Sequence, residues 1–132
     1  MATAPDPDVT GSVVLIGRPV RRRGRRTGHW GTEVLLVGTD RRQLHERRGD
    51  VEAHGYRVAT TDDPQRAVGL VVALRPDVVV VDASLLIREA PAYRRLRDEA
   101  ATLEIPIIIL GPDARVHATP ATLMRHIETF VE

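Results

Sequence analysis

Asp82 ends the most apolar stretch of the chain, which follows Pro76 and contains four consecutive valines at residues 78–81. An apolar run without alternation is typical of a strand that is buried on both faces of a parallel sheet. β-branched side chains also favour strand geometry. Ligands of open α/β sheets bind beyond the carboxyl ends of the strands. The sequence therefore places Asp82 where a functional site would lie.

The other residues that could do chemistry form no recognisable catalytic or metal-binding motif. The chain has no Cys, which excludes disulfides and thiolate metal sites. The histidines are not spaced with acids as metal ligands, and no Gly-rich phosphate-binding loop is present. Nothing sets a Ser, a His and an Asp near one another. We therefore expect no metal, no cofactor and no enzymatic activity. The histidines are His29, His45, His54, His117 and His126.

Arginine is concentrated near the N-terminus, in a segment that we term the Arg-rich arm. Residues 1–32 contain six Arg and two Asp, a net charge of +4, whereas residues 33–132 contain thirteen Arg and sixteen acids, a net charge of −3. Such an arm would bind phosphate backbones or acidic protein surfaces, or it is only a solvated linker. The aromatic content of 3% argues against a base-stacking platform. The arm comprises Arg18, Arg21, Arg22, Arg23, Arg25 and Arg26.

Short apolar runs alternate with helical patterns from residue 33 onward. Asp40 is a suitable N-terminal cap for the first helix and Gly55 a suitable C-terminal stop. Pro64 suits the first turn of the second helix. The pattern predicts strands at residues 34–37, 56–60, 77–82 and 105–110, and helices at 41–54, 64–74, 91–103 and 121–131, the last with Leu123, Ile127 and Phe130 facing inward.

Strands that alternate with helices predict a parallel sheet with right-handed crossovers. We therefore expect one α/β, doubly wound domain over residues 33–132, preceded by an N-terminal extension over residues 1–32. No apolar run reaches the roughly 18 residues of a membrane span, and the N-terminus does not resemble a signal peptide. A cytoplasmic protein without membrane contact is expected.

Four segments, in this order, resemble the receiver domain of bacterial two-component response regulators. They are residues 34–40 (Val-Leu-Leu-Val-Gly-Thr-Asp), 54–58 (His-Gly-Tyr-Arg-Val), 75–82 (Arg-Pro-Asp-Val-Val-Val-Val-Asp) and 105–110 (Ile-Pro-Ile-Ile-Ile-Leu). The resemblance covers residues 33–111 and, more loosely, 119–131. It implies a flavodoxin-like fold, in which a five-stranded parallel sheet of order 2-1-3-4-5 carries helices on both faces.

In that family, the aspartate at the end of the third strand accepts a phosphoryl group from a histidine kinase, and Asp82 occupies this position. The transfer needs Mg²⁺ to neutralise the phosphoryl oxygens, and Mg²⁺ prefers carboxylate ligands. The family supplies an acidic pair directly after the first strand. Here these positions are Gly38 and Thr39. Asp40 comes one residue later, where it would cap the helix instead.

Two further family positions are also changed. The hydroxyl residue that follows the fourth strand in the family is Gly111 here. The Lys that precedes a Pro after the fifth strand is Thr119, and the chain contains no Lys. The resemblance therefore implies a degenerate, or pseudo-, receiver domain. In such a domain we expect Asp82 to make local backbone hydrogen bonds at the strand end instead of accepting a phosphoryl group.

The chain between the fourth predicted strand and Pro120 is short. Only nine residues, 111–119, lie there, whereas a crossover with a helix needs about a dozen or more. We therefore expect the fourth helix to be missing or reduced. The Ile-rich strand edge left open would promote aggregation unless it is covered. An edge strand at residues 114–118 would cover it, as would an extra N-terminal strand at residues 12–16, which we favour.

These features predict a stand-alone, atypical receiver-like domain that acts by protein–protein contact in bacterial signalling, independently of phosphorylation. A homodimer through the altered fourth-strand edge fits, because receiver domains commonly pair through that side. Two alternatives stay open. One is a response regulator that is phosphorylated on Asp82 and binds Mg²⁺ weakly with the help of Asp40. The other is a nucleic-acid-associated regulator that binds through the Arg-rich arm.

Overall fold

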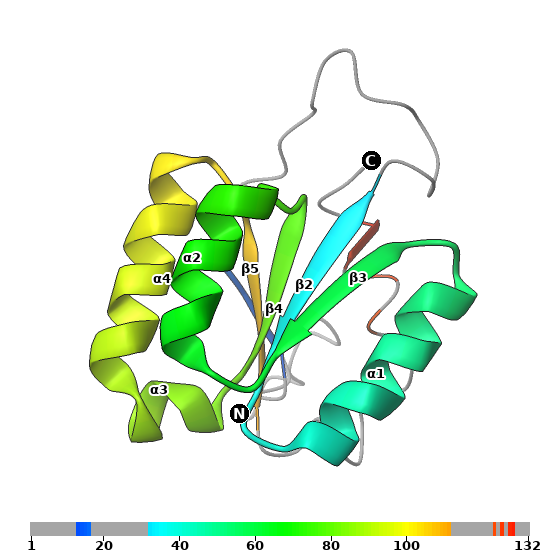
Figure 1. Ribbon diagram of the computed structural model, residues 1–132, viewed down its shortest axis with the longest axis horizontal. Helices are drawn as coiled ribbons and strands as arrows, with labels where there is room; N and C mark the ends of the chain where they lie inside the picture. Colours follow the sequence, from blue (N-terminus) through cyan, green and yellow to red (C-terminus); the bar gives the residue numbers. More distant parts are fainter. Residues whose placement is uncertain (1–12, 17–31, 112–122, 124, 126, 129–132) are drawn as a thin grey trace, which may run out of the picture.

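A mainly parallel sheet forms the centre of the protein in the computed structural model, which describes residues 13–16, 32–111, 123, 125, 127 and 128 (Figure 1). The order within the sheet is β1-β5-β4-β2-β3. Four strands, β2 to β5, are parallel to one another. The strands are β1 (Val13–Ile16), β2 (Glu33–Val37), β3 (Arg57–Thr61), β4 (Val78–Asp82) and β5 (Ile107–Leu110). The predicted α/β class is confirmed, and the order of the parallel strands is consistent with a flavodoxin-like fold.

Strand β1 lies antiparallel to β5, in a register that pairs Val13 with Leu110 and Ile16 with Ile107. The residues of β5 are all buried. Apolar β1 thus extends the sheet on the side of β5 away from β4, where we expected the Ile-rich edge to need a cover. The alternative edge strand at residues 114–118 and the expected loss of the fourth helix lie outside the described residues.

Helices cover both faces of the sheet (Figure 1). On one face, α1 packs with Leu123 and Ile127, and on the other, α2 packs with α3 and α4. The helix bounds are α1 (Arg41–Ala53), α2 (Pro64–Leu74), α3 (Ser84–Arg88) and α4 (Ala90–Thr102). Within these described segments, no helix combines the length and the apolar character needed to cross a membrane.

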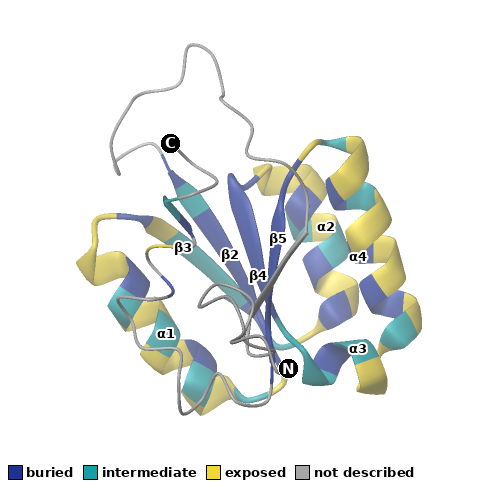
Figure 2. Cartoon of the chain, turned by 180° about the vertical axis from the view of Figure 1, so that it is seen from behind, coloured by how far each residue is buried: buried dark blue, intermediate teal, exposed yellow. Residues whose placement is uncertain are grey.

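Strand β4 separates two hydrophobic cores (Figure 2). Val78 and Val80 belong to the core beneath α1, whereas Val79 and Val81 belong to the core beneath α2 and α4. None of the four valines is more than 2% exposed. The predicted strand that is buried on both faces is therefore confirmed. The uninterrupted valine run is explained by the period of two along a strand, because consecutive side chains point into different cores.

The ends of the helices follow the local sequence signals. Asp40 caps α1, and its carboxylate accepts hydrogen bonds from the backbone N–H groups of Arg42 and Gln43. Asp63 caps α2 in the same way, with Pro64 in the first turn. Gly55 follows α1 with a φ of 91°, a left-handed conformation that favours glycine. The predicted cap of α1 and the C-terminal stop at Gly55 are confirmed, and the capping role of Asp63 is a finding of the structure.

The described elements begin and end within two residues of their predicted bounds. Leu123 and Ile127 are buried as predicted, and Phe130 lies outside the described residues. Short helix α3 is a finding that the sequence pattern did not predict. Its Leu85 is fully buried in the core beneath α2 and α4.

Asp77 joins the amino ends of β2 and β4. Its side chain is 6% exposed, and Oδ2 accepts a hydrogen bond of 2.8 Å from the backbone N–H of Glu33. The backbone N–H of Asp77 donates in turn to the Glu33 carbonyl at 2.8 Å. This reciprocal pair aligns the two strands at the end opposite Asp82.

Replacing Asp77 by Ala should therefore destabilise the fold. The Glu33 N–H would lose a charged, buried acceptor, and we expect the free energy of unfolding to fall by about 1–3 kcal/mol. Urea denaturation followed by circular dichroism measures this change. Asp98→Ala, at an exposed acid of α4, is the matched control and should change stability by less than about 0.5 kcal/mol. Equal effects of the two substitutions would contradict the assigned role of Asp77.

Candidate functional site at the carboxyl end of the sheet

Asp82 lies at the carboxyl end of β4, between the ends of β2 and β5. Val81 is paired with Val37 of β2, so that Gly38 follows beside Asp82. A Cβ atom built on Gly38 would lie 3.8 Å from the Asp82 Cβ. On the other side, Asp82 is paired with Leu110, which directly precedes Gly111. The structure therefore brings together three of the predicted site positions, namely Gly38, Asp82 and Gly111.

The Asp82 carboxylate is half-buried and accepts hydrogen bonds from within the protein. Its Oδ1 accepts from the backbone N–H of Ser84 at 3.2 Å. With the Gln43 amide oriented so that both its ends find partners, Nε2 donates to Asp82 Oδ2 at 3.3 Å, and Oε1 accepts from Arg47 at 3.2 Å. Each carboxylate oxygen thus has a neutral donor. Arg47, the cation in this chain of contacts, bonds to Gln43 and not to Asp82 itself.

Gly38 stands at the first position where the receiver family carries an acid. The packing of α1 leaves no room for a side chain at this position. A Cβ at Gly38 would lie 3.3 Å from Leu44 Cδ2 and 3.5 Å from Leu44 Cγ. Leu44 is only 6% exposed and belongs to the core beneath α1, so that it has little room to move away. A longer side chain at position 38 would therefore disturb the contact between α1 and the sheet.

The two residues after Gly38 have other roles. Thr39 is exposed, and its hydroxyl lies 3.4 Å from the Ser84 hydroxyl. Asp40 Oδ1 accepts from the backbone N–H groups of Arg42 at 3.0 Å and Gln43 at 3.2 Å. The expectation that Asp40 caps the helix is therefore confirmed. In the described part of the chain, no three residues among His, Asp and Glu gather in a way that could hold a metal ion.

The remaining predicted site residues lie outside the residues that the structure describes. These are Thr119, after the fourth predicted strand, and the six arginines of the Arg-rich arm.

Sequence reasoning missed the Gln43 side chain, which contacts Asp82. Gln43 follows the capping Asp40 by three residues, a spacing that predicts a capping box in which the third helical residue bonds back to the cap. In the structure its amide instead reaches Asp82 and Arg47. The hydrogen bond from the Ser84 backbone N–H confirms the local backbone bond expected for Asp82, since the spacing of two residues is that of an Asx turn.

The tight contact at Gly38 predicts that Gly38→Ala destabilises the protein. The backbone at Gly38 has no positive φ, so the added methyl group acts through its contact with Leu44 alone. We expect a loss of about 1 kcal/mol or more in the free energy of unfolding, as for other overpacked sites. Gly69→Ala in α2 is the control, because a Cβ there has no neighbour within 4 Å. This substitution should stabilise by about 0.5–1 kcal/mol. Urea denaturation of both variants checks the difference, and a Gly38→Ala variant as stable as Gly69→Ala would refute the packing argument.

No match to this chain is found among protein-family models or among curated proteins. Similarity to known proteins therefore assigns no family. The function of the site must be inferred from its chemistry, which is that of a half-buried carboxylate with neutral internal donors and no second carboxylate at the adjoining positions 38 and 39.

Proposed function

We propose that this chain is a stand-alone, receiver-like domain of bacterial signalling that acts by binding another protein in the cytoplasm, independently of phosphorylation. The observation that carries the proposal is the environment of Asp82. The carboxylate stands at the end of the central strand, where a receiver domain carries its phosphoacceptor. Its Oδ1 accepts a hydrogen bond from the Ser84 backbone N–H, and Oδ2 accepts one from Gln43 Nε2 when the amide is oriented so that both its ends find partners. Both donors are neutral.

Phosphoryl transfer to Asp82 would bring concentrated negative charge to this end of the sheet. Mg²⁺ and a fixed cation neutralise such charge in phosphoryl-transfer sites. The positions nearest to Asp82 carry glycine, and Asp40 is bound to the start of α1. Arg47 reaches Asp82 only through the Gln43 amide. This arrangement favours a carboxylate that serves as a structural acceptor over one that is phosphorylated.

The strand order supports the receiver-like part of the proposal. The parallel strands follow the order β3-β2-β4-β5, which corresponds to positions 2-1-3-4 of the doubly wound flavodoxin-like sheet. Antiparallel β1 lies where the fifth parallel strand of that sheet would be. A surface that receiver domains use for pairing would therefore be rebuilt here, which supports a changed mode of protein contact.

A magnesium titration tests the proposal at its central claim. We expect the amide NMR signals of Gly38, Asp82 and Gly111 to show no saturable shift when Mg²⁺ and then beryllium fluoride, a mimic of the phosphoryl group, are added. The physical reason is that one carboxylate with neutral donors neither holds the metal nor compensates the charge of the mimic.

Two variants make this titration decisive. Thr39→Asp adds a second carboxylate after β2 at an exposed position and leaves the packing at Gly38 unchanged. This variant should produce Mg²⁺-dependent shifts around Asp82, which shows that the measurement detects such a site. Asp82→Asn removes the acceptor. Saturable shifts in the natural sequence that disappear in Asp82→Asn would mean that the protein is a phosphorylation switch, and the proposal would be wrong.

A further inference from the structure

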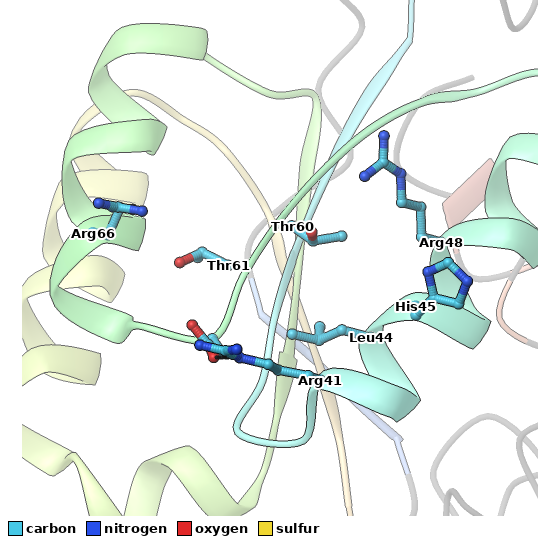
Figure 3. Close-up of a pocket in the computed structure, with 8 residues that line it drawn as sticks. Arg41, Leu44, His45, Arg48, Thr60, Thr61 and Arg66 are labelled. Carbon is cyan, nitrogen blue, oxygen red and sulfur yellow. Dashed lines mark hydrogen bonds and ion pairs between the residues drawn. The ribbon is translucent and has the colours of Figure 1, made fainter.

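A polar groove of about 310 Å³ lies beside β3, between α1 and the start of α2 (Figure 3). It lies at the opposite side of the sheet from β1, since β3 and β1 are the two end strands. Basic side chains from both helices surround it, and hydroxyl side chains from the end of β3 form its floor. Neither the resemblance to receiver domains nor the environment of Asp82 assigns a role to it.

The charge of the groove comes mainly from one face of α1. Arg41, His45 and Arg48 follow one another at intervals of four and three residues, which places them in a stripe about 10 Å long. Arg66 extends toward the groove from α2 (Figure 3). Asp62 is the one acid among the lining residues, so that with neutral His45 the lining carries a net charge of +2. A hollow with this charge would attract an anionic ligand.

Two of these arginines already pair with acids of the same chain. Arg48 Nε donates to Glu52 Oε2 at 3.4 Å, with both side chains 47% exposed. The Arg41 guanidinium donates to the Asp62 carboxylate, and this contact holds the pKa of Asp62 below its usual range and raises that of Arg41. The Arg41 side chain is nonetheless 87% exposed. An incoming carboxylate would therefore compete with Asp62 for a guanidinium that is already at the surface of the groove.

The backbone of β3 offers a second kind of contact. Arg57 N–H donates to the Thr32 carbonyl, and the Thr61 carbonyl accepts from Gly38 N–H. These positions of β3 thus face β2, and because backbone groups alternate along a strand, those of Val58 and Thr60 face the other way. In the described part of the sheet, β3 pairs only with β2. Its outer edge can therefore take up a further strand.

We propose that the groove binds an extended acidic segment of a partner protein, which adds to the outer edge of β3 as a strand. A strand rises about 3.3 Å per residue, so that two acids two residues apart fall within the length of the α1 stripe and point to the same side. Backbone hydrogen bonds to β3 would supply affinity, and the arginines would select acidic side chains. No aromatic side chain lines the groove, which argues against nucleic-acid bases as the occupant.

This inference rests on the proposed role in protein binding, but it does not depend on the chemistry of Asp82. The two proposals can therefore fail separately. An Mg²⁺-dependent site at Asp82 would overturn the proposed function and leave the groove unaffected. A groove that binds no acidic peptide would overturn this inference alone.

The test uses the full chain, labelled with ¹⁵N, and a capped peptide in which Glu alternates with Thr and Val. We expect saturable amide shifts along β3 and α1, which include Val58 and Thr60, at low ionic strength. Arg48→Gln and Arg66→Gln should each raise the Kd by roughly 2- to 5-fold, the effect of one exposed ion pair. Arg95→Gln in α4 makes the same change in charge at an exposed position outside the groove lining, and should leave the Kd unchanged.

Asp62→Asn should change the Kd of the peptide in the opposite direction. Removal of the acid frees Arg41, so the peptide should bind roughly 2- to 5-fold more tightly. A general loss of folding cannot produce this result. Asp82→Ala should bind the peptide as the natural sequence does, which separates the groove from the carboxyl end of β4.

A second peptide distinguishes strand addition from simple attraction of charge. It has the same sequence, but its alternate backbone amides are N-methylated on the side that would face β3. We expect its Kd to rise about 3- to 10-fold or more, because each lost backbone hydrogen bond weakens binding. The inference is overturned if neither peptide binds or if both bind equally. It is also overturned if inorganic phosphate, or an oligonucleotide of equal charge, displaces the bound peptide as effectively as unlabelled acidic peptide does.

Discussion

Burial of β4 on both of its faces is the constraint on which the rest of the structure depends. Its four valines point alternately into two cores, one beneath α1 and one beneath α2 and α4. Helices must therefore cover both faces of the sheet, and the strand leaves the core only at its ends. A polar residue is stable at each end, where backbone N–H groups are available to it. Asp77 binds the start of β2 at the amino end, and Asp82 binds the turn into α3 at the carboxyl end.

The packing that builds the core also determines the chemistry at Asp82. Leu44 belongs to the core beneath α1, and its side chain fills the volume that a side chain at position 38 would need. Close approach of α1 therefore favours the smallest residue at position 38. The same helix brings Gln43 to Asp82, so that the side-chain amide, in the orientation that satisfies both its ends, donates a hydrogen bond to the carboxylate. Dense packing of Leu44 against Gly38 leaves no room there for a larger side chain.

The two end strands of the sheet differ in character. β1 is apolar and lies antiparallel on β5. β3 carries hydroxyl side chains next to a stripe of basic residues. Charged side chains beside an edge strand discourage indiscriminate pairing, and they also make any pairing selective for the opposite charge. With basic side chains beside it, the edge of β3 would pair more readily with an acidic strand than with a neutral or basic one.

The sequence by itself determined the α/β layers and the described elements other than the short helix α3. Runs without alternation, such as residues 78–81, report burial on both faces, and Asp40, Gly55 and Pro64 act within a few residues of their own position, so that local patterns predicted them. It also placed Asp82 at the end of a strand.

Only the tertiary structure decided what surrounds that carboxylate and where the groove lies. The contact between Gln43 and Asp82 and the pairing of Arg41 with Asp62 join residues 39 and 21 positions apart. Such contacts depend on the angle at which a helix packs on the sheet, which no local pattern encodes.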